Sequence, residues 1–160
     1  MNESCAHGLH LFDFDSAGYD RNGLEILGHD ESLRLLATKS LGRIGLTVGA
    51  LPTVLPVNFR LIGERIYFRS SSGQKLTAAT SHAVVAFEVD EIDSTAHEGW
   101  SVVVTGVAHP VETEAEIARI ESFGIPQWAP SDGSRLVSIS TDLVTGRRLN
   151  QVSIVARPPG

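Results

Sequence analysis

The chain has a single cysteine, Cys5, among its 160 residues. One cysteine cannot form a disulfide within the chain, and it cannot build a cysteine-based zinc site. A reducing compartment therefore suits the protein, and we expect it to act in the cytoplasm. The N-terminus also lacks a basic stretch followed by an apolar run, so no secretory signal is expected.

Long apolar stretches and an excess of basic residues are missing as well. No segment approaches the roughly 20 apolar residues that a membrane-spanning helix needs. The formal net charge is −6 at pH 7, whereas proteins that bind nucleic acid broadly present a basic surface. We therefore expect neither a membrane nor a nucleic-acid partner, although individual basic residues can still hold one anionic ligand.

The remaining composition is that of one globular domain, since 42% of the residues are hydrophobic and 160 residues can bury a core. Residues 1–23 are rich in glycine and aspartate, which predicts an irregular N-terminal arm before a folded domain over 24–160. The six histidines are scattered, and no metal site is predicted. No Gly-x-Ser-x-Gly turn is present, and no catalytic residue can be assigned.

Strands follow one another through the centre of the chain. Apolar residues alternate with other residues over 42–48, the period of a half-buried strand. Gly49-Ala50 and Gly63-Glu64 then predict turns, so that three antiparallel strands run consecutively over 42–48, 51–62 and 65–70. Further strands are predicted at 24–27, 82–91, 99–111, 135–139 and 144–149.

Two helices interrupt these strands. One is predicted over 31–39 with Asp30 as its N-cap, and the other over 112–123 with Thr113 as a cap. A parallel sheet would need a helix between successive strands, and these strands lack them. The sequence therefore predicts a mainly β fold, an antiparallel barrel with flanking helices.

The strongest chemical signal is the run YFRSSSGQKL at residues 67–76. A strand ends there in small hydroxyl residues, a glycine and Lys75, which can direct backbone amides and an ammonium group at one point. Arg69 adds a planar guanidinium suited to a phosphate. The segment is either a phosphate site or an ordinary polar hairpin.

Residues 54–59 carry a second signal, because Pro56 interrupts an otherwise good strand. A proline removes one ladder donor, so it belongs at a sheet edge or a bulge, where backbone groups can face a planar ligand. Asn58 offers both a donor and an acceptor to such a ring. An irregular edge strand with a satisfied asparagine is the other interpretation.

The acidic residues at 88–93 come third. No histidine stands at a useful spacing beside them, so they indicate a solvated strand end rather than a metal site. Trp100, close behind, could stack on a ring or fill the rim of the barrel.

In their order and spacing, these segments resemble the flavin-binding split-barrel family related to pyridoxamine 5′-phosphate oxidase. They are particularly similar to its actinobacterial and nitroimidazole-resistance-like branch. The resemblance covers residues 24–149, and it rests on GRIG at 42–45, LPVNF at 55–59, FRS to KL over 68–76, FEVD at 87–90 and GWSVVVTG at 99–106.

The resemblance implies an FMN-binding split barrel that forms a homodimer with two FMN molecules at its interface. By this analogy Arg69, Ser70 and Lys75 hold the phosphate, and residues 54–59 line the isoalloxazine ring with main-chain groups. Glu88 lies near the ring edge or the ribitol, and Trp100 and Ser101 reach across the interface. The implied cofactor-binding set is Val54, Leu55, Pro56, Val57, Asn58, Phe59, Phe68, Arg69, Ser70, Lys75, Glu88, Trp100 and Ser101.

The resemblance also bears on the reaction. The chain lacks the fuller set of basic substrate-phosphate residues, so oxidation of vitamin B6 is not implied. The favoured function is a flavin-dependent oxidoreductase that reduces a small organic acceptor, such as a quinone or a nitro compound. A flavin-binding sensor or store without turnover, and a reductase that uses a deazaflavin coenzyme, stay open as alternatives. Arg147 and Arg148 match a basic C-terminal feature of the branch.

Overall fold

The computed structural model describes residues 18–70, 80–127 and 133–150. Within these ranges the chain forms β1 (Gly18–Tyr19), β2 (Glu25–Leu27), α1 (His29–Leu36), β3 (Leu41–Val48), β4 (Leu51–Ile62), β5 (Arg65–Ser70), β6 (Ala83–Asp93), β7 (Glu98–Pro110), α3 (Glu114–Ser122), β8 (Arg135–Ser140) and β9 (Leu143–Leu149).

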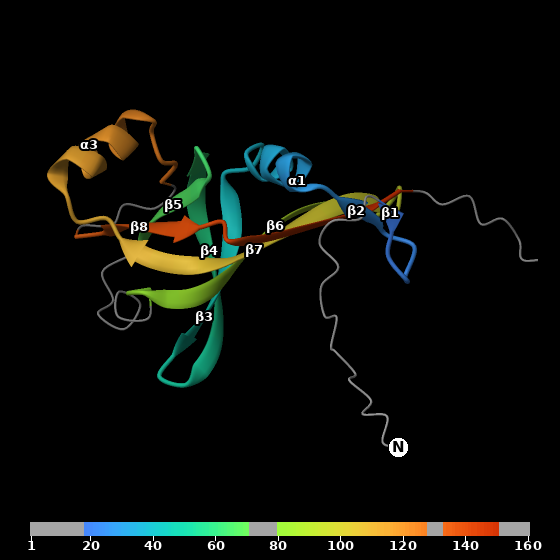
Figure 1. Ribbon diagram of the computed structural model, residues 1–160, viewed down its shortest axis with the longest axis horizontal. Helices are drawn as coiled ribbons and strands as arrows, with labels where there is room; N and C mark the ends of the chain where they lie inside the picture. Colours follow the sequence, from blue (N-terminus) through green and yellow to red (C-terminus); the bar gives the residue numbers. More distant parts are fainter. Residues whose placement is uncertain (1–17, 71–79, 128–132, 151–160) are drawn as a thin grey trace, which may run out of the picture.

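Six of these strands close into an antiparallel barrel (Figure 1). The strand order is β1-β2-β9-β7-β6-β3-β4-β5-β8, and β7 also pairs with β8, which joins the two ends of the run from β7 to β8. One edge of β7 is shared, since β9 pairs with 99–105 and β8 with 108–110. The predicted mainly β barrel with flanking helices is confirmed.

The barrel interior is filled by aromatic and branched side chains. Phe59, Phe68 and Phe87 are at most 1% exposed, and the rings of Phe59 and Phe87 meet edge to face with centroids 4.8 Å apart. A Cβ at Gly42 would overlap the Phe87 ring, so only glycine fits beside it. A smaller cluster under α3 consists of Tyr67, Val111, Ile120 and Leu136.

Both predicted turns between β3, β4 and β5 are present. Gly49 and Ala50 have φ of 55° and 66°, the left-handed pair of a two-residue hairpin turn, and Gly63 has a φ of 60°. The turn fixes the register, in which Val48 faces Leu51 and Leu41 faces Asn58. The alternation seen in the sequence therefore becomes a buried and an exposed face.

The helices begin and end at other residues than predicted. α1 starts at His29 with Gly28 as its N-cap, and Asp30 is not the cap but lies in the first turn. Ser32 fixes this start, because its amide and its hydroxyl donate to the Gly28 carbonyl at 3.0 and 2.8 Å. Thr113 holds the predicted N-cap position of α3, but its side chain makes no capping hydrogen bond.

The last part of the predicted arm is ordered by the sheet. Gly18 and Tyr19 pair with Ile26 and Glu25, and Asp20 Oδ1 accepts hydrogen bonds from two following backbone amides. Residues 18–23 therefore differ from the expected irregular arm, and residues 1–17 lie outside the described ranges.

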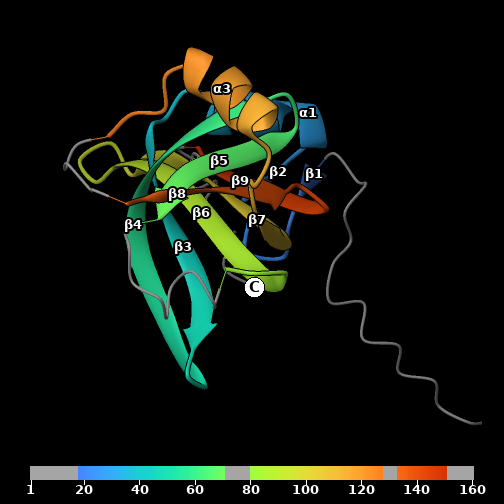
Figure 2. The same cartoon turned by 90° about the vertical axis from the view of Figure 1, so that its left-hand side faces the viewer.

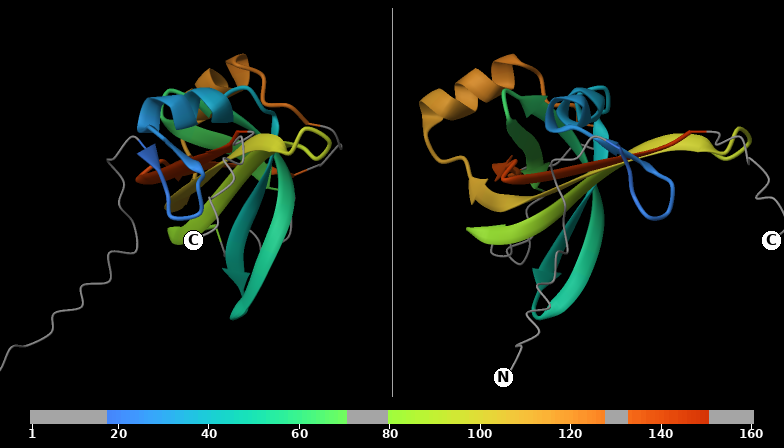
Figure 3. Two further views of the ribbon diagram at one scale, coloured as in Figure 1. Left: turned by 90° about the vertical axis from the view of Figure 1, so that its right-hand side faces the viewer. Right: turned by 45° about the vertical axis from the view of Figure 1, so that its right-hand side comes forward.

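The helices and the β3–β4 hairpin mark opposite sides of the barrel. α1 and α3 lie on one side, and the tip of the hairpin projects from the other (Figure 2). The distal part of the β6–β7 hairpin extends sideways with β9, β2 and β1 (Figure 3). Across the described ranges, no helix is long and apolar enough to cross a membrane.

Candidate functional site

The predicted site residues divide between the two faces of the sheet. Side chains of β4 alternate, so that Leu55, Val57 and Phe59 pack in the barrel core while Val54 is 67% exposed on the outer face. On the outer face with Val54 are Pro56, Asn58, Glu88 and Ser101, whereas Phe68 and Trp100 share the inner side with the core residues. The side chains of Phe59 and Phe68 are enclosed in the core, so they offer no surface to a ligand.

The outer half of β4 has an edge that no described strand covers. β4 pairs with β3 over 51–58, but its pairing with β5 runs only over 59–62. The Phe59 amide donates to the Ser40 carbonyl at 3.0 Å. Since amides alternate along a strand, odd-numbered residues direct theirs toward β3, and even-numbered residues direct theirs toward the open edge.

This parity explains the two prolines of the strand. Pro52 and Pro56 both fall on even positions, where a missing N–H costs no bond to β3. Val54 lies between them and offers both an amide and a carbonyl to the open edge. Of the two settings predicted for Pro56, an edge or a bulge, the described strands show an edge, which is a row of main-chain groups interrupted by two prolines.

Asn58 stands where the open edge begins. Its Nδ2 donates to the Ser40 carbonyl at 3.3 Å, the same oxygen that binds the Phe59 amide. The side chain therefore fastens β4 to the connection between α1 and β3.

The end of β5 lies beside the same point. The pairing of β4 with β5 ends at the pair Phe59 and Phe68. Beyond this pair the two strands separate, and we call this point the fork. Asn58 on β4 and Arg69 on β5 are the first residues past it. Arg69 projects on the α3 side, where its NH2 donates to the Glu121 carboxylate and its NH1 to Ser134 Oγ at 3.4 Å. The guanidinium at the fork is therefore held by an acidic residue of α3, which the sequence did not indicate.

Of the other two predicted phosphate residues, Ser70 and Lys75, only Ser70 lies within the described ranges. Ser70 follows Arg69 directly and is only 2% exposed. Lys75 lies outside the described residues.

Glu88 lies on the outer face of β6, the strand next to β3. Arg43 separates it from Pro56 in a row across three strands, and Arg43 NH1 lies 3.2 Å from Glu88 Oε2 and 3.6 Å from Asp90 Oδ1. Burial raises the pKa of the Glu88 carboxyl, the charge of Asp90 acts in the same direction, and Arg43 opposes both.

Small and apolar residues surround this ion pair. Gly45 faces Val54 on one side and Ala86 on the other, and Leu41 and Val84 are 41% and 70% exposed on the same face. We call Leu41, Gly45, Val54, Val84 and Ala86 the outer apolar patch. It is a group of small and apolar residues next to the open edge of β4, and its larger side chains are exposed.

Trp100 and Ser101 lie on β7 and point to opposite faces. Trp100 packs partly against the core, and Lys39 Nζ stands 5.8 Å from its ring centroid. Ser40, the next residue along the chain, binds Asn58, so one short connection links Trp100 to the fork. Ser101 faces Asp90 on β6 and Arg147 on β9.

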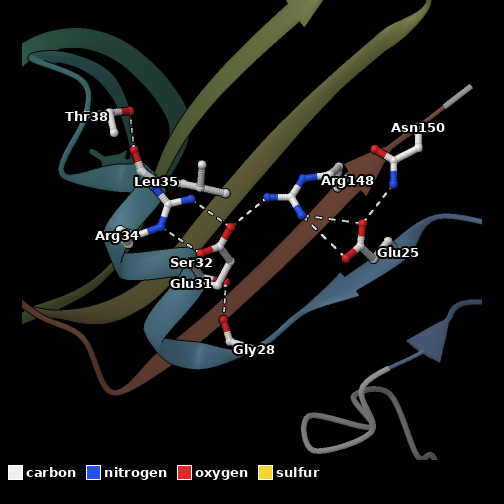
Figure 4. Close-up of polar contacts among 9 residues, drawn as sticks. All are labelled: Glu25, Gly28, Glu31, Ser32, Arg34, Leu35, Thr38, Arg148 and Asn150. Carbon is white, nitrogen blue, oxygen red and sulfur yellow. Dashed lines mark hydrogen bonds and ion pairs between the residues drawn. The ribbon is translucent and has the colours of Figure 1, made fainter.

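The two C-terminal arginines form structural ion pairs. Arg148 donates to Glu31 of α1 at 2.7 Å and to Glu25 of β2 at 3.4 Å, and Glu31 also accepts from Arg34 (Figure 4). Arg147 lies 3.3 Å from Asp20. These contacts hold β2 and α1 against β9, and they give the predicted basic feature a role in the fold.

A family model described as pyridoxamine 5′-phosphate oxidase matches residues 28–148. The chain belongs to this family. The match covers every strand of the barrel and confirms the resemblance drawn from the sequence.

Relatives that cover more than three quarters of this chain occur in actinobacteria. An uncharacterized protein of Mycobacterium tuberculosis is 36% identical over 128 residues, which are 77% of this chain and 84% of the relative. A crystal structure of a candidate pyridoxamine 5′-phosphate oxidase from Corynebacterium glutamicum has a TM-score of 0.71 and 32% identity, covering 79% of this chain and 98% of that one. The FAD-binding protein of Mycobacterium smegmatis has a TM-score of 0.67 and 34% identity, covering 78% and 97%.

Proposed function

We propose that this protein is a flavin-dependent oxidoreductase of the cytoplasm that binds FMN, or the FMN half of FAD, at the fork between β4 and β5. The open edge of β4 is the observation that carries the proposal. It supplies main-chain donors and acceptors at a sheet edge in a family with an FAD-binding relative.

The edge suits the polar rim of an isoalloxazine ring. That rim alternates carbonyl and N–H groups, and an exposed strand edge can pair with it as it would pair with another strand. Between Pro52 and Pro56, Val54 supplies an amide and a carbonyl. In the row across the sheet from Val54 lie Gly45 and then Ala86, which have no side chain or a small one and so leave room for a flat ring.

Arg69 is the cation of the described site for the flavin phosphate. Its contacts with Glu121 and Ser134 use the two terminal nitrogens, and a guanidinium has five donor hydrogens. A phosphate would therefore share Arg69 with Glu121 or displace it. Lys75, six residues further along the chain, is the second proposed phosphate ligand.

The bound flavin would supply electron or hydride transfer, and the chain would supply its position and electrostatic surroundings. We expect the acceptor to be a small organic molecule such as a quinone or a nitro compound. Glu88 and Arg43 lie in the row that begins at Pro56, so they are the charged groups proposed to orient the ring edge or the ribitol.

A second copy of the chain is the proposed partner. The outer apolar patch and the projecting β3–β4 hairpin expose branched side chains next to the site, and burying such a surface favours association. Light scattering at micromolar concentration should therefore give the mass of a dimer. A monomer at that concentration would contradict a site completed by a partner subunit.

The first experiment is the visible absorption spectrum of the purified protein, followed by titration with FMN, FAD and the deazaflavin coenzyme. We expect the absorption bands of an oxidised flavin or tight uptake of FMN or FAD. Preference for the deazaflavin would change the coenzyme, and uptake without electron transfer to any acceptor would indicate a sensor or store. A protein that binds none of the three would contradict the proposal.

A pair of variants tests the phosphate ligand. Arg69→Ala should weaken FMN binding by about 10- to 150-fold, the effect of one lost charge-assisted hydrogen bond of about 1.5–3 kcal/mol. Arg65→Ala is the matched control, because it removes the same charge from the other end of β5. Equal effects of the two substitutions would contradict the role of Arg69.

A further inference from the structure

Two histidines meet on the outer face of the barrel, beyond the Val84 end of the outer apolar patch. Ala83 faces Ala108 in the register of β6 and β7, and the next two residues outward are His82 and His109. Their ring centroids are 4.8 Å apart, with an angle of 87° between the rings. Ala83 and Ala108 turn toward the core, so the two imidazoles lie on the opposite, outer side.

The surroundings fix His82 in place. Its amide donates to the Ala108 carbonyl at 2.8 Å, and its φ of 57° lies in the left-handed region. Residues other than glycine are uncommon in that region, and histidine is among those that adopt it more often. Ser81 Oγ lies 3.3 Å from His82 Nδ1. A proton on Nδ1 donated to this hydroxyl leaves the Nε2 lone pair available, the arrangement usual for a metal-binding histidine.

We propose that His82 and His109 form a two-histidine site for a divalent transition-metal ion. With metal–nitrogen bonds of about 2.0–2.1 Å, two imidazoles on one ion have centroids about 4.5 Å apart at a right angle and about 5.2 Å apart in a tetrahedron. The observed separation of 4.8 Å lies between these values. Binding would require one ring to turn about its Cβ–Cγ bond so that a nitrogen of each imidazole faces the same ion.

Two protein ligands define the class of ion and the strength of binding. Imidazole suits Cu²⁺, Ni²⁺ and Zn²⁺ rather than Mg²⁺ or Ca²⁺. Among the described residues, no group of three or more histidine, cysteine or acidic side chains is arranged to hold a metal. The site therefore leaves coordination positions open to water or a small anion, and its affinity is below that of a closed structural site.

Nickel titration of the full chain tests this site, with thermal unfolding as the readout. A ligand that binds only the folded protein raises the melting temperature, by about 3–6 °C at ten times its Kd for a chain of this length. His7 and His10 are three residues apart in the sequence, so the titration is repeated on a chain that carries His7→Gln and His10→Gln, in which the rise should persist.

Three variants assign the rise to its residues. His82→Asn and His109→Gln should each abolish it, and His97→Asn should keep it. His97 is the matched control for His82, because it also has a left-handed backbone, with a φ of 53°, and asparagine tolerates that conformation. Unchanged rises in both site variants, or no saturable rise in the unmodified chain up to millimolar Ni²⁺, would overturn the proposal.

A second measurement does not depend on the stability of these variants. In a chain that carries His7→Gln and His10→Gln, one equivalent of Cu²⁺ should show the electron paramagnetic resonance couplings of two imidazole nitrogens. Couplings to one nitrogen or none would refute the two-histidine site.

Discussion

Replacing Val54 by proline removes one main-chain donor from the proposed flavin site and changes little else. Val54 is an even-numbered residue of β4, so its amide points away from β3 and into the open edge. Pro52 and Pro56 occupy the neighbouring positions of the same parity, so the strand already accommodates proline there. The side chain is 67% exposed, and its exchange gives up little burial.

The size of the effect follows from which partner is lost. No bond to β3 is broken, so we expect the free energy of unfolding to change by less than about 1 kcal/mol. A flavin acceptor that pairs with the Val54 amide would be left unsatisfied at a cost of about 1–3 kcal/mol, which corresponds to FMN binding weaker by about 5- to 150-fold.

Leu55→Pro is the matched control, because Leu55 directs its amide toward β3 and packs against the core. This substitution should lower the free energy of unfolding by at least about 1–3 kcal/mol. Urea unfolding without cofactor and fluorescence titration with FMN measure the two quantities. The same loss of stability in both variants would refute the assigned parity, and unchanged FMN affinity in Val54→Pro would refute the role of the edge.

Three further predictions concern single side chains. Glu121→Gln removes the carboxylate that is paired with Arg69, so FMN should bind several-fold tighter in a titration. Riboflavin, which lacks the phosphate, should bind with unchanged affinity. Equal gains in affinity for both ligands would contradict competition between Glu121 and the phosphate for Arg69. Hydrogen bonds from Arg34, then from Arg148, lower the pKa of Glu31 to about 2. The stability from these bonds is fully present above about pH 4.5 and is lost as the pH falls toward 2, so urea unfolding should show a smaller acid loss in Glu31→Gln than in the unmodified chain. Gly106→Ala places a Cβ against the Ser140 carbonyl and should lower the melting temperature by several degrees, whereas Gly45→Ala, which meets only ordinary contacts, should not.

The barrel could be predicted because its signals are local. The Gly49-Ala50 and Gly63-Glu64 turns each join strands whose alternation is visible within a dozen residues. The start of α1 differs from the prediction because an acidic residue is favoured both at the N-cap and in the first turn of a helix. Asp30 suits an N-cap, but it also suits the first turn near the positive end of the helix, and the structure uses the second.

The charged part of the site could not be predicted in the same way. Arg69 and Glu121 are 52 residues apart, and Arg148 reaches residues more than 110 positions away. Long side chains on exposed surfaces carry no periodic signal, because their partners depend on how the elements pack. Arg69 can be proposed as a phosphate ligand from its own segment, but the acidic residue that holds it depends on the packing of α3.

The open edge of β4 lies between these two cases, since its parity follows from the sequence. A two-residue turn at Gly49-Ala50 makes Val48 and Leu51 a hydrogen-bonded pair, so even-numbered residues of β4 must direct their amides away from β3. Pro52 and Pro56 are both even, and prolines on one parity indicate that the strand has no partner on that side. The two prolines and the turn together therefore locate an open main-chain edge from one hairpin, whereas a single proline indicates only an irregular strand.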